Sequence, residues 1–345
     1  MLIDRILIVG LGSIGRRHLR LAREHYPNAD IRILRHQTTN EVAEYSNGSF
    51  SYLDEAIKFA PQIAVIASPA SFHIPTAQAL AEVGTHLLIE KPLSASLHGV
   101  LKLLKTCQKQ QIVLLTGYNL RFLPSLQYFK TMLSEGAIGK VLSVRCETGN
   151  YLPYWRPEAD YRDMVSARSE LGGGVLLEIS HEIDYLRWIF GEINWVSATL
   201  NRQSDLEIDV EDTAHLILGF APAFDGHELI GVANLDFIRQ DETRMCIAIG
   251  EKGSLRWNGL TGVVDHFEAG AKEWREVFKH PHQRDDSYIS EWGDFITCVM
   301  ESKTPFISGE EGVKVLQIIE AARHSAASCG RRCSVKAMHL KKDSS

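Results

Sequence analysis

The first residues of the chain constrain its fold more than any other segment. An apolar run at residues 6–9 leads directly into a G-x-G-x-x-G pattern at residues 10–15. This order predicts a strand, a tight turn and the start of a helix. The first glycine permits the turn, the second lets the backbone approach a pyrophosphate, and the third lets the helix pack closely on the strand. The segment predicts a dinucleotide site at the helix N-terminus. The residues expected to bind the cofactor here are Gly10, Gly12, Ser13, Ile14 and Gly15.

The choice between NAD and NADP is expected to depend on the end of the second strand, predicted at residues 31–34. A carboxylate there commonly binds the ribose 2′-hydroxyl of NAD. This chain has Arg35 and His36 instead. A cation suits the 2′-phosphate of NADP better, so we expect NADP or NAD as the cofactor, with NADP preferred. The alternative is that Arg35 points into solvent.

Composition excludes several classes of protein. The net charge of -6 argues against a nucleic-acid-binding surface. Because no stretch approaches the roughly 18 apolar residues of a membrane span, we expect no membrane partner. The six cysteines are scattered without a C-x-x-C pair. We therefore expect no metal site, and the cysteines are typical of free thiols in a reducing cytoplasm, where we expect the protein to be located.

Strands and helices alternate over the first third of the chain. Buried strands are predicted at residues 63–67, 86–89 and 112–115, with helices between them. This alternation predicts an α/β fold with a doubly wound parallel sheet, the Rossmann architecture, over residues 1–120. Ligands bind at the carboxyl ends of such strands. The residues expected there to contact the cofactor are Ser68, Pro69, His73, Glu90 and Lys91.

The pattern changes after residue 120. Alternating apolar and polar runs separated by turn residues extend from residue 141 to residue 257, and helices follow. They predict a C-terminal α+β domain, residues 121–345, with a large, open and mainly antiparallel sheet. An open sheet leaves one face and its edges to be covered. We therefore expect a homo-oligomer, a dimer or tetramer, that forms through this sheet.

Several motifs occur together in a characteristic order. They are residues 10–15, Ser68-Pro69 with His73, Glu90-Lys91-Pro92, residues 119–124, and the segment from Gly172 to Asp184. With them the chain resembles the Gfo/Idh/MocA family of NAD(P)-dependent oxidoreductases along nearly its whole length. The resemblance implies oxidation or reduction of a hydroxyl or keto carbon of a small carbohydrate substrate. The loop at residues 155–162 and the segment 172–184 resemble members found with bacterial surface-sugar biosynthesis, which implies a sugar, nucleotide sugar or acidic sugar.

The resemblance includes one departure. Many family members have an aspartate four residues before the active-site histidine, whereas this chain has Glu178 three residues before His181. On a helix, either spacing places the two side chains on one face.

Two residues are candidates for the proton transfer that accompanies hydride transfer. A histidine near pKa 6.5 is poised for this at neutral pH, whereas lowering a lysine pKa from about 10.4 to about 7.5 costs on the order of 4 kcal/mol. We therefore expect His181 to be the acid/base and Lys91 to hydrogen-bond the reacting oxygen. Glu178 and Asp184 are expected to orient the imidazole or to bind substrate hydroxyls; the alternative is a carboxylate that stabilises a helix N-terminus or lies on a solvated helix face.

Aromatic and cationic residues follow the last predicted strand of the first domain and fill the loop before Gly172. They suit stacking on a sugar and binding of a carboxylate or phosphate. Such residues are also enriched in subunit interfaces, so both interpretations stay open for the loop, and Arg121 could equally form a structural ion pair. The residues expected to bind substrate are Tyr118, Arg121, Trp155, Arg156, Arg162 and Arg168.

Two other functions are compatible with the same motifs. One is a regulatory protein that binds the cofactor without turnover, which needs only the glycine turn. The other is a glycosidase that uses the nicotinamide transiently and consumes none of it. Lys91, His181 and the two neighbouring carboxylates favour an oxidoreductase acting on CH–OH groups.

Overall fold

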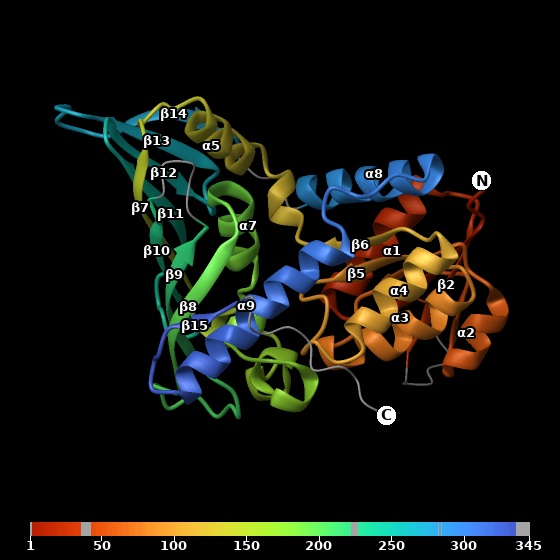
Figure 1. The fold of residues 1–345 in the computed structure, drawn as a ribbon. Coiled ribbons are helices and arrows are strands. Elements are labelled where there is room, and N and C mark those ends of the chain that lie inside the picture. The colour runs from red at the N-terminus through yellow and green to blue at the C-terminus, as the bar shows by residue number, and fades with distance from the viewer. Residues whose placement is uncertain (1, 36–42, 222–226, 282, 284, 336–345) are drawn as a thin grey trace. The chain divides into compact units, whose positions relative to one another are not determined.

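The computed structural model describes residues 2–35, 43–221, 227–281, 283 and 285–335. The chain divides into two compact units (Figure 1). One comprises Met1–Tyr118 and Ile289–Leu316, and the other Asn119–Tyr288 and Gln317–Ser345. Residues 289–316 lie within the predicted second domain, residues 121–345, yet they group by their contacts with the first unit.

The first unit is built on a six-stranded sheet in the order β3-β2-β1-β4-β5-β6. Every pair of neighbouring strands is parallel. The strand order reverses between β1 and β4, which is where such sheets bind nucleotides. This confirms the predicted doubly wound sheet. The strands are β1 (Arg5–Val9), β2 (Asp30–Leu34), β3 (Gly48–Phe50), β4 (Ile63–Ile66), β5 (His86–Glu90) and β6 (Leu114–Gly117).

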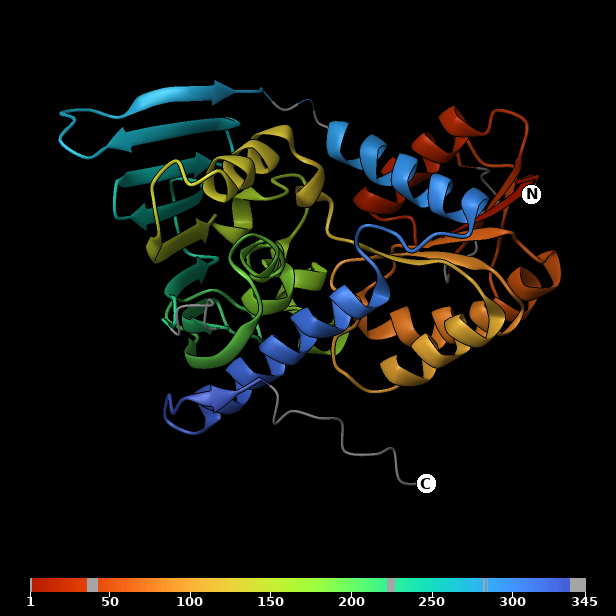
Figure 2. The same ribbon diagram turned by 45° about the horizontal axis from the view of Figure 1, so that its top comes forward.

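Helices cover both faces of this sheet (Figure 2). Helices α1 (Ser13–His25) and α8 (Asp286–Glu301) lie on one face, and α3 (His73–Glu82) and α4 (Val100–Gln110) on the other. The short helix α2 (Leu53–Phe59) follows β3. The central strands are fully buried on both faces, which accounts for the uninterrupted apolar runs in their sequence.

Two contacts explain why residues 289–316 belong to the first unit. Trp292 of α8 is fully buried, and its indole Nε1–H donates to Nδ1 of His18 on α1 at 2.9 Å. Beyond α8, Ser308 forms an antiparallel bridge with Leu115 and so pairs with the edge strand β6. The segment thus covers both an apolar face and an open edge of the sheet.

The second unit contains a nine-stranded sheet in the order β14-β13-β12-β11-β7-β10-β9-β8-β15. Only the β7–β10 pair is parallel among the described pairings, so the predicted, mainly antiparallel sheet is confirmed. The strands are β7 (Val141–Gly149), β8 (Ile193–Asn201), β9 (Thr213–Phe220), β10 (Ile230–Asp236), β11 (Thr243–Gly250), β12 (Gly253–Asn258), β13 (Val263–Glu268), β14 (Arg275–Lys279) and β15 (Cys333–Ser334).

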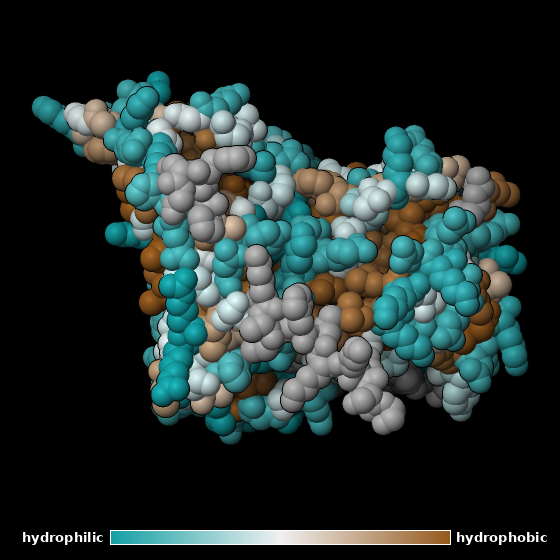
Figure 3. Space-filling view, in the orientation of Figure 1, coloured by the Kyte–Doolittle hydropathy of each residue, from teal (hydrophilic) through white to brown (hydrophobic). Residues whose placement is uncertain are grey.

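Helices α5 (Pro124–Ser134), α7 (His181–Phe190) and the second half of α9 (Gly309–Ala327) pack on one face of this sheet (Figure 1). Trp257 of β12 is fully buried there; its ring packs edge-on against Tyr185 of α7, and its indole donates to Ser125 Oγ of α5 at 3.0 Å. On the opposite face side chains remain accessible, as at Ile217, which is 44% exposed. Hydrophobic and hydrophilic side chains are interspersed along this sheet at the left of Figure 3.

None of the helices in the described ranges has both the length and the apolar character that a membrane-spanning helix requires.

Candidate functional site

The glycine turn has the geometry that its sequence predicts. Gly10 has φ +88°, and a Cβ there would lie 2.8 Å from the carbonyl oxygen of Ala67. A Cβ on Gly15 would lie 2.2 Å from the Gly10 carbonyl oxygen. Both positions therefore require glycine, since any side chain would force β1, β4 and α1 apart. A Cβ on Gly12 would meet nothing within 4 Å.

The open space at Gly12 lies at the N-terminus of α1. Gly12 is the N-cap and Ser13 the first helical residue; both are exposed, and Ile14 is half-buried. No side chain caps this end, and the first turn carries no acidic residue. Backbone N–H groups and the positive end of the helix dipole therefore face open space, which is the arrangement that binds a phosphate.

Arg35 directly follows β2, and its side chain is half-buried. Its backbone N–H donates to the carbonyl of Phe50 at 3.1 Å, which fixes the start of the loop against β3. His36, the other residue expected to bind the adenosine end of the cofactor, lies outside the described residues.

His73 joins the loops that follow β4 and β5. Its imidazole is 1% exposed; Nε2 lies 2.7 Å from the Ser68 carbonyl oxygen and Nδ1 lies 3.1 Å from that of Pro92. Burial lowers the pKa of His73, although both carbonyl oxygens favour a protonated ring. His73 thus connects the loop that carries Ser68 and Pro69 to the loop that carries Lys91, the two loops predicted to contact the cofactor.

Glu90 ends β5 and points into the first unit. It is 6% exposed; its Oε1 lies 2.7 Å from His18 Nε2, and its Oε2 accepts from the Lys91 backbone N–H at 3.1 Å. Burial alone would raise the pKa of Glu90, but the His18 hydrogen bond and the nearby Lys91 ammonium hold it below its usual range. Lys91 itself is half-buried, and the Lys91–Pro92 peptide bond is cis.

In the second unit, the segment that carries His181 is two helices and not one. Helix α6 (Val175–Glu178) ends at Glu178, and α7 begins at His181 after a break at Ile179 and Ser180. The expectation that Glu178 and His181 share one face of a helix was therefore wrong, because helical spacing alone does not reveal a two-residue interruption. His181 is 9% exposed, and Glu178 is half-buried.

Asp184 lies one turn along α7 and binds Arg121 through both carboxylate oxygens. The distances are 2.6 Å from Arg121 Nη2 to Oδ1 and 2.8 Å from Nε to Oδ2. Both residues are about 2% exposed or less. This is the structural ion pair that the sequence left open as the alternative for Arg121. Tyr118, at the end of the first unit, is fully buried.

The loop before Gly172 contains several short 3-10 turns and is held by its own charges. Arg162 donates to both carboxylate oxygens of Asp160 and to Glu207 at 2.8 Å. The Arg162 guanidinium lowers the pKa of Asp160 to about 2. Arg168 Nε donates to the Arg162 carbonyl oxygen at 2.7 Å. These contacts tie the exposed cations Arg162 and Arg168 into one loop.

Two further loop residues differ in their surroundings. Trp155 is half-buried, donates from Nε1 to the Asn150 carbonyl oxygen at 3.1 Å and packs edge-on against Phe237. Arg156 is exposed. The indole of Trp155 thus closes the loop onto the sheet, while the guanidinium of Arg156 stays accessible to an anionic ligand.

Helix α7 is anchored to the sheet by a residue that was not predicted from the sequence. Glu182, next to His181, is fully buried and accepts from Thr148 Oγ1 at 3.0 Å and from Arg244 Nε at 2.9 Å. Thr148 and Arg244 come from the neighbouring strands β7 and β11. No sequence signal indicates this role, because the partners are 34 and 62 residues away.

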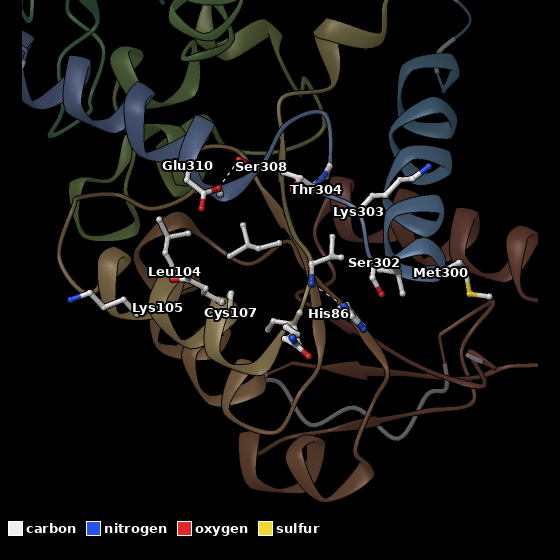
Figure 4. A pocket seen from close by; sticks show the side chains of 18 of the residues that line it. His86, Leu104, Lys105, Cys107, Met300, Ser302, Lys303, Thr304, Ser308 and Glu310 are labelled. Carbon is white, nitrogen blue, oxygen red and sulfur yellow. Dashed lines mark hydrogen bonds between the residues drawn. The ribbon is translucent and has the colours of Figure 1, made fainter.

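A separate cavity of about 900 Å³ opens in the first unit (Figure 4). It is lined by His86 at the start of β5, by Leu104 and Cys107 of α4, and by residues from 299 to 310. These are the amino ends of the strands, opposite the edge where the glycine turn lies. Nucleotides bind at the carboxyl ends, so this cavity is not the predicted cofactor site.

Comparisons with known proteins agree with this geometry. Residues 5–118 match a family model described as "Oxidoreductase family, NAD-binding Rossmann fold". Residues 130–333 match its companion, "Oxidoreductase family, C-terminal alpha/beta domain". The chain belongs to the Gfo/Idh/MocA oxidoreductase family. The resemblance seen in the sequence is thereby confirmed, and the protein is an oxidoreductase of this family.

Two relatives illustrate the Gfo/Idh/MocA assignment. Myo-inositol 2-dehydrogenase of Thermotoga maritima is 29% identical over 93% of this chain and 96% of its own length. Levoglucosan dehydrogenase of Pseudarthrobacter phenanthrenivorans is 36% identical over a shorter stretch, 39% of this chain and 35% of its own.

Solved structures of the family share the fold. Levoglucosan dehydrogenase in complex with NADH and levoglucosan matches with a TM-score of 0.79 at 24% identity, over 96% of this chain and 98% of the other. The WlbA dehydrogenase from Bordetella pertussis in complex with NADH and UDP-GlcNAcA matches with a TM-score of 0.78 at 22% identity, over 96% and 99%.

Proposed function

We propose that this protein transfers a hydride between a nicotinamide cofactor and a hydroxyl or keto carbon of a sugar, nucleotide sugar or acidic sugar. The observation that carries the proposal is the uncapped N-terminus of α1 at Gly12 in a chain that matches both halves of an oxidoreductase family. Relatives named for inositol and levoglucosan support a polyhydroxylated substrate.

The residues for the chemistry are His181 and Lys91. When bound, the nicotinamide accepts the hydride from the C–OH carbon. His181 takes the hydroxyl proton during oxidation and returns it during reduction, because histidine side chains can exchange a proton near neutral pH. Lys91 donates a hydrogen bond to the same oxygen and stabilises the negative charge that develops there.

The neighbouring carboxylates have different roles in this proposal. Glu178, half-buried at the end of α6, orients the imidazole of His181 or binds a substrate hydroxyl. Asp184 acts through its ion pair with Arg121, which holds α7 in place. Exposed Arg156 and the Arg162–Arg168 part of the loop bind the anionic group of an acidic substrate.

For the cofactor, the half-buried cation Arg35 favours NADP over NAD. The NADH in the structures of two family relatives supports NAD. We propose that the protein binds both, with the 2′-phosphate of NADP contacting Arg35. Titration of the purified protein with NADH and with NADPH, followed by nicotinamide fluorescence, tests this directly. Tighter binding of NADPH supports the role of Arg35, and binding of neither cofactor contradicts the proposal.

We also propose a homo-oligomer formed through the outer face of the nine-stranded sheet. Ile217, Val232, Arg145 and Ile247 lie side by side there on neighbouring strands. Three of these four side chains are apolar, and apolar side chains on an open sheet face become buried when a second copy covers them. A cytoplasmic location fits the six free thiols, which an oxidising compartment would tend to pair.

A further inference from the structure

Three ionisable side chains meet in the interior of the first unit, behind the strand end that carries Lys91. They are His18 of α1, Glu90 of β5 and Glu291 of α8, with exposed fractions of 0%, 6% and 0%. One nitrogen or oxygen atom from each lies within 4.8 Å of the other two. A buried cluster of one imidazole and two carboxyl groups holds either a cation or protons, and the two possibilities predict different hydrogen bonds.

The hydrogen bonds of His18 favour protons. The indole Nε1–H of Trp292 donates to His18 Nδ1 at 2.9 Å, and an indole nitrogen can only donate. Nδ1 must therefore be an acceptor, which places the ring proton on Nε2, where it is donated to Glu90 Oε1 at 2.7 Å. A metal at this site would need the Nε2 lone pair, and ligating histidines usually donate from the other nitrogen. In this protein Nδ1 already accepts the hydrogen bond from Trp292, so it cannot donate one.

Glu90 is satisfied as a carboxylate. His18 donates to one oxygen, and the Lys91 backbone N–H donates to the other at 3.1 Å. Gly117 of the neighbouring strand leaves the room for it: a Cβ there would stand 3.1 Å from Glu90 Oε2. The hydrogen bonds from His18 and from the Lys91 backbone N–H thus fix the position of the Glu90 carboxylate. Through the second of these bonds, Glu90 in turn holds the backbone at Lys91.

Glu291 has no such partners. It is fully buried, and neither of its carboxyl oxygens has a hydrogen-bond partner within the described residues. The charges that act on it are those of Glu90 from β5 and Asp294 from its own helix, and the imidazole of His18 on α1 completes the cluster. Burial first, and then these two carboxylates, raise the pKa of Glu291 well above its usual value. Two buried carboxylates this close would repel each other strongly if both were ionised.

We propose that Glu291 is a positioning residue kept as an uncharged carboxylic acid, so that Glu90 stays ionised on the Lys91 backbone amide and holds Lys91 in place. The last step rests on the proposed role of Lys91. The protonation state of Glu291 does not depend on that role, and it can be measured without any substrate.

The test compares the wild-type protein with Glu291→Gln, which keeps the shape and removes the titration. Glu301→Gln, the same substitution at an exposed site on α8, is the control. Infrared spectra at neutral pH should show the carbonyl stretch of a protonated carboxylic acid in the wild type and the control. The band should be absent in Glu291→Gln. An identical band in all three proteins, or no such band in any, overturns the proposal, as does one bound metal ion per chain that is lost in Glu291→Gln.

Stability gives a second readout. Unfolding exposes Glu291, which then ionises at its ordinary pKa. Above that pKa and below the raised value in the folded protein, the wild-type unfolding constant should rise by up to tenfold per pH unit relative to Glu291→Gln. The ratio of the two constants should stay level if Glu291 is ionised in the folded state, and this result would overturn the proposal.

Activity tests the positioning role. As the pH is raised until the infrared band disappears, wild-type kcat should fall, and kcat of Glu291→Gln should not follow that fall. An unchanged wild-type kcat across this transition overturns the positioning role. If the proposed function is wrong, no variant turns over any sugar, while the infrared and unfolding results still stand.

Discussion

Arg121 and Asp184 form a two-point ion pair, at 2.6 and 2.8 Å, inside the second unit. Because both side chains are almost fully buried, removing the carboxylate leaves a guanidinium without its counter-charge in the interior. We expect Asp184→Ala to lower the free energy of unfolding by about 3–5 kcal/mol. Urea denaturation measures this. Asp160→Ala, which breaks the exposed pair with Arg162, should have a much smaller effect; equal losses would contradict the account.

The glycine turn predicts opposite results for two alanine substitutions. In Gly12→Ala the new methyl group enters open space, so the free energy of unfolding should change by less than about 1 kcal/mol while cofactor affinity falls at least about tenfold. In Gly15→Ala the methyl group meets the Gly10 carbonyl, and stability should fall by more than about 2 kcal/mol. Cofactor titration and urea denaturation of both variants check this. Unchanged cofactor affinity in Gly12→Ala would show that the pyrophosphate binds elsewhere.

Arg35 is expected to discriminate between the two cofactors. Arg35→Ala should weaken NADPH binding by about tenfold or more, because a charge-assisted bond to the 2′-phosphate is lost, and should leave NADH affinity nearly unchanged. Arg32→Ala is the control, since Arg32 lies on β2, three residues before Arg35, and pairs with Asp30. Fluorescence titration gives all the affinities. Equal effects of Arg35→Ala on NADH and NADPH would assign discrimination to another residue.

The oligomer prediction concerns Ile217. Ile217→Lys replaces an exposed apolar side chain of the outer sheet face with a charged one and should shift the protein toward monomers in sedimentation experiments. Leu260→Lys, at an exposed turn residue after β12, should leave the assembly unchanged. A monomeric wild-type protein would contradict the proposal at once.

Much of this architecture could be predicted from local sequence. The glycine turn, the apolar runs and the alternating pattern each report on neighbours within a few residues, so they predicted the strands and both sheet types. The position of residues 289–316 and the inward turn of Glu90 toward His18 depend on partners far along the chain. His18 lies 274 residues from Trp292 and 72 from Glu90, and no local pattern encodes such contacts.

The helix break between Glu178 and His181 shows the same limit at short range. Residues 179 and 180 carry no proline or glycine, so the sequence predicts an uninterrupted helix. Just after the break, Glu182 is held by Thr148 and Arg244 of the sheet, and these long-range contacts leave no local sequence pattern. The residues expected to do the chemistry could be named from motifs, but their surroundings could not.

If His181 and Lys91 act on the reacting oxygen, their substitution should lower kcat much more than it lowers cofactor affinity. His181→Ala and Lys91→Ala should each lower kcat by about 10²–10⁴-fold, because each removes a group that acts on the reacting oxygen. Cofactor affinity should stay close to wild type in His181→Ala. Near-normal kcat in both variants would contradict the assignment.

The central claim is that this protein oxidises or reduces a sugar with a nicotinamide cofactor. Its most direct test is the absorbance of the reduced nicotinamide during incubation of the purified protein with NAD or NADP and a panel of sugars, nucleotide sugars and acidic sugars. We predict that absorbance rises with at least one substrate in the wild type and remains flat in His181→Ala. Tight cofactor binding with no change in absorbance for any compound, in either direction of the reaction, would contradict the claim.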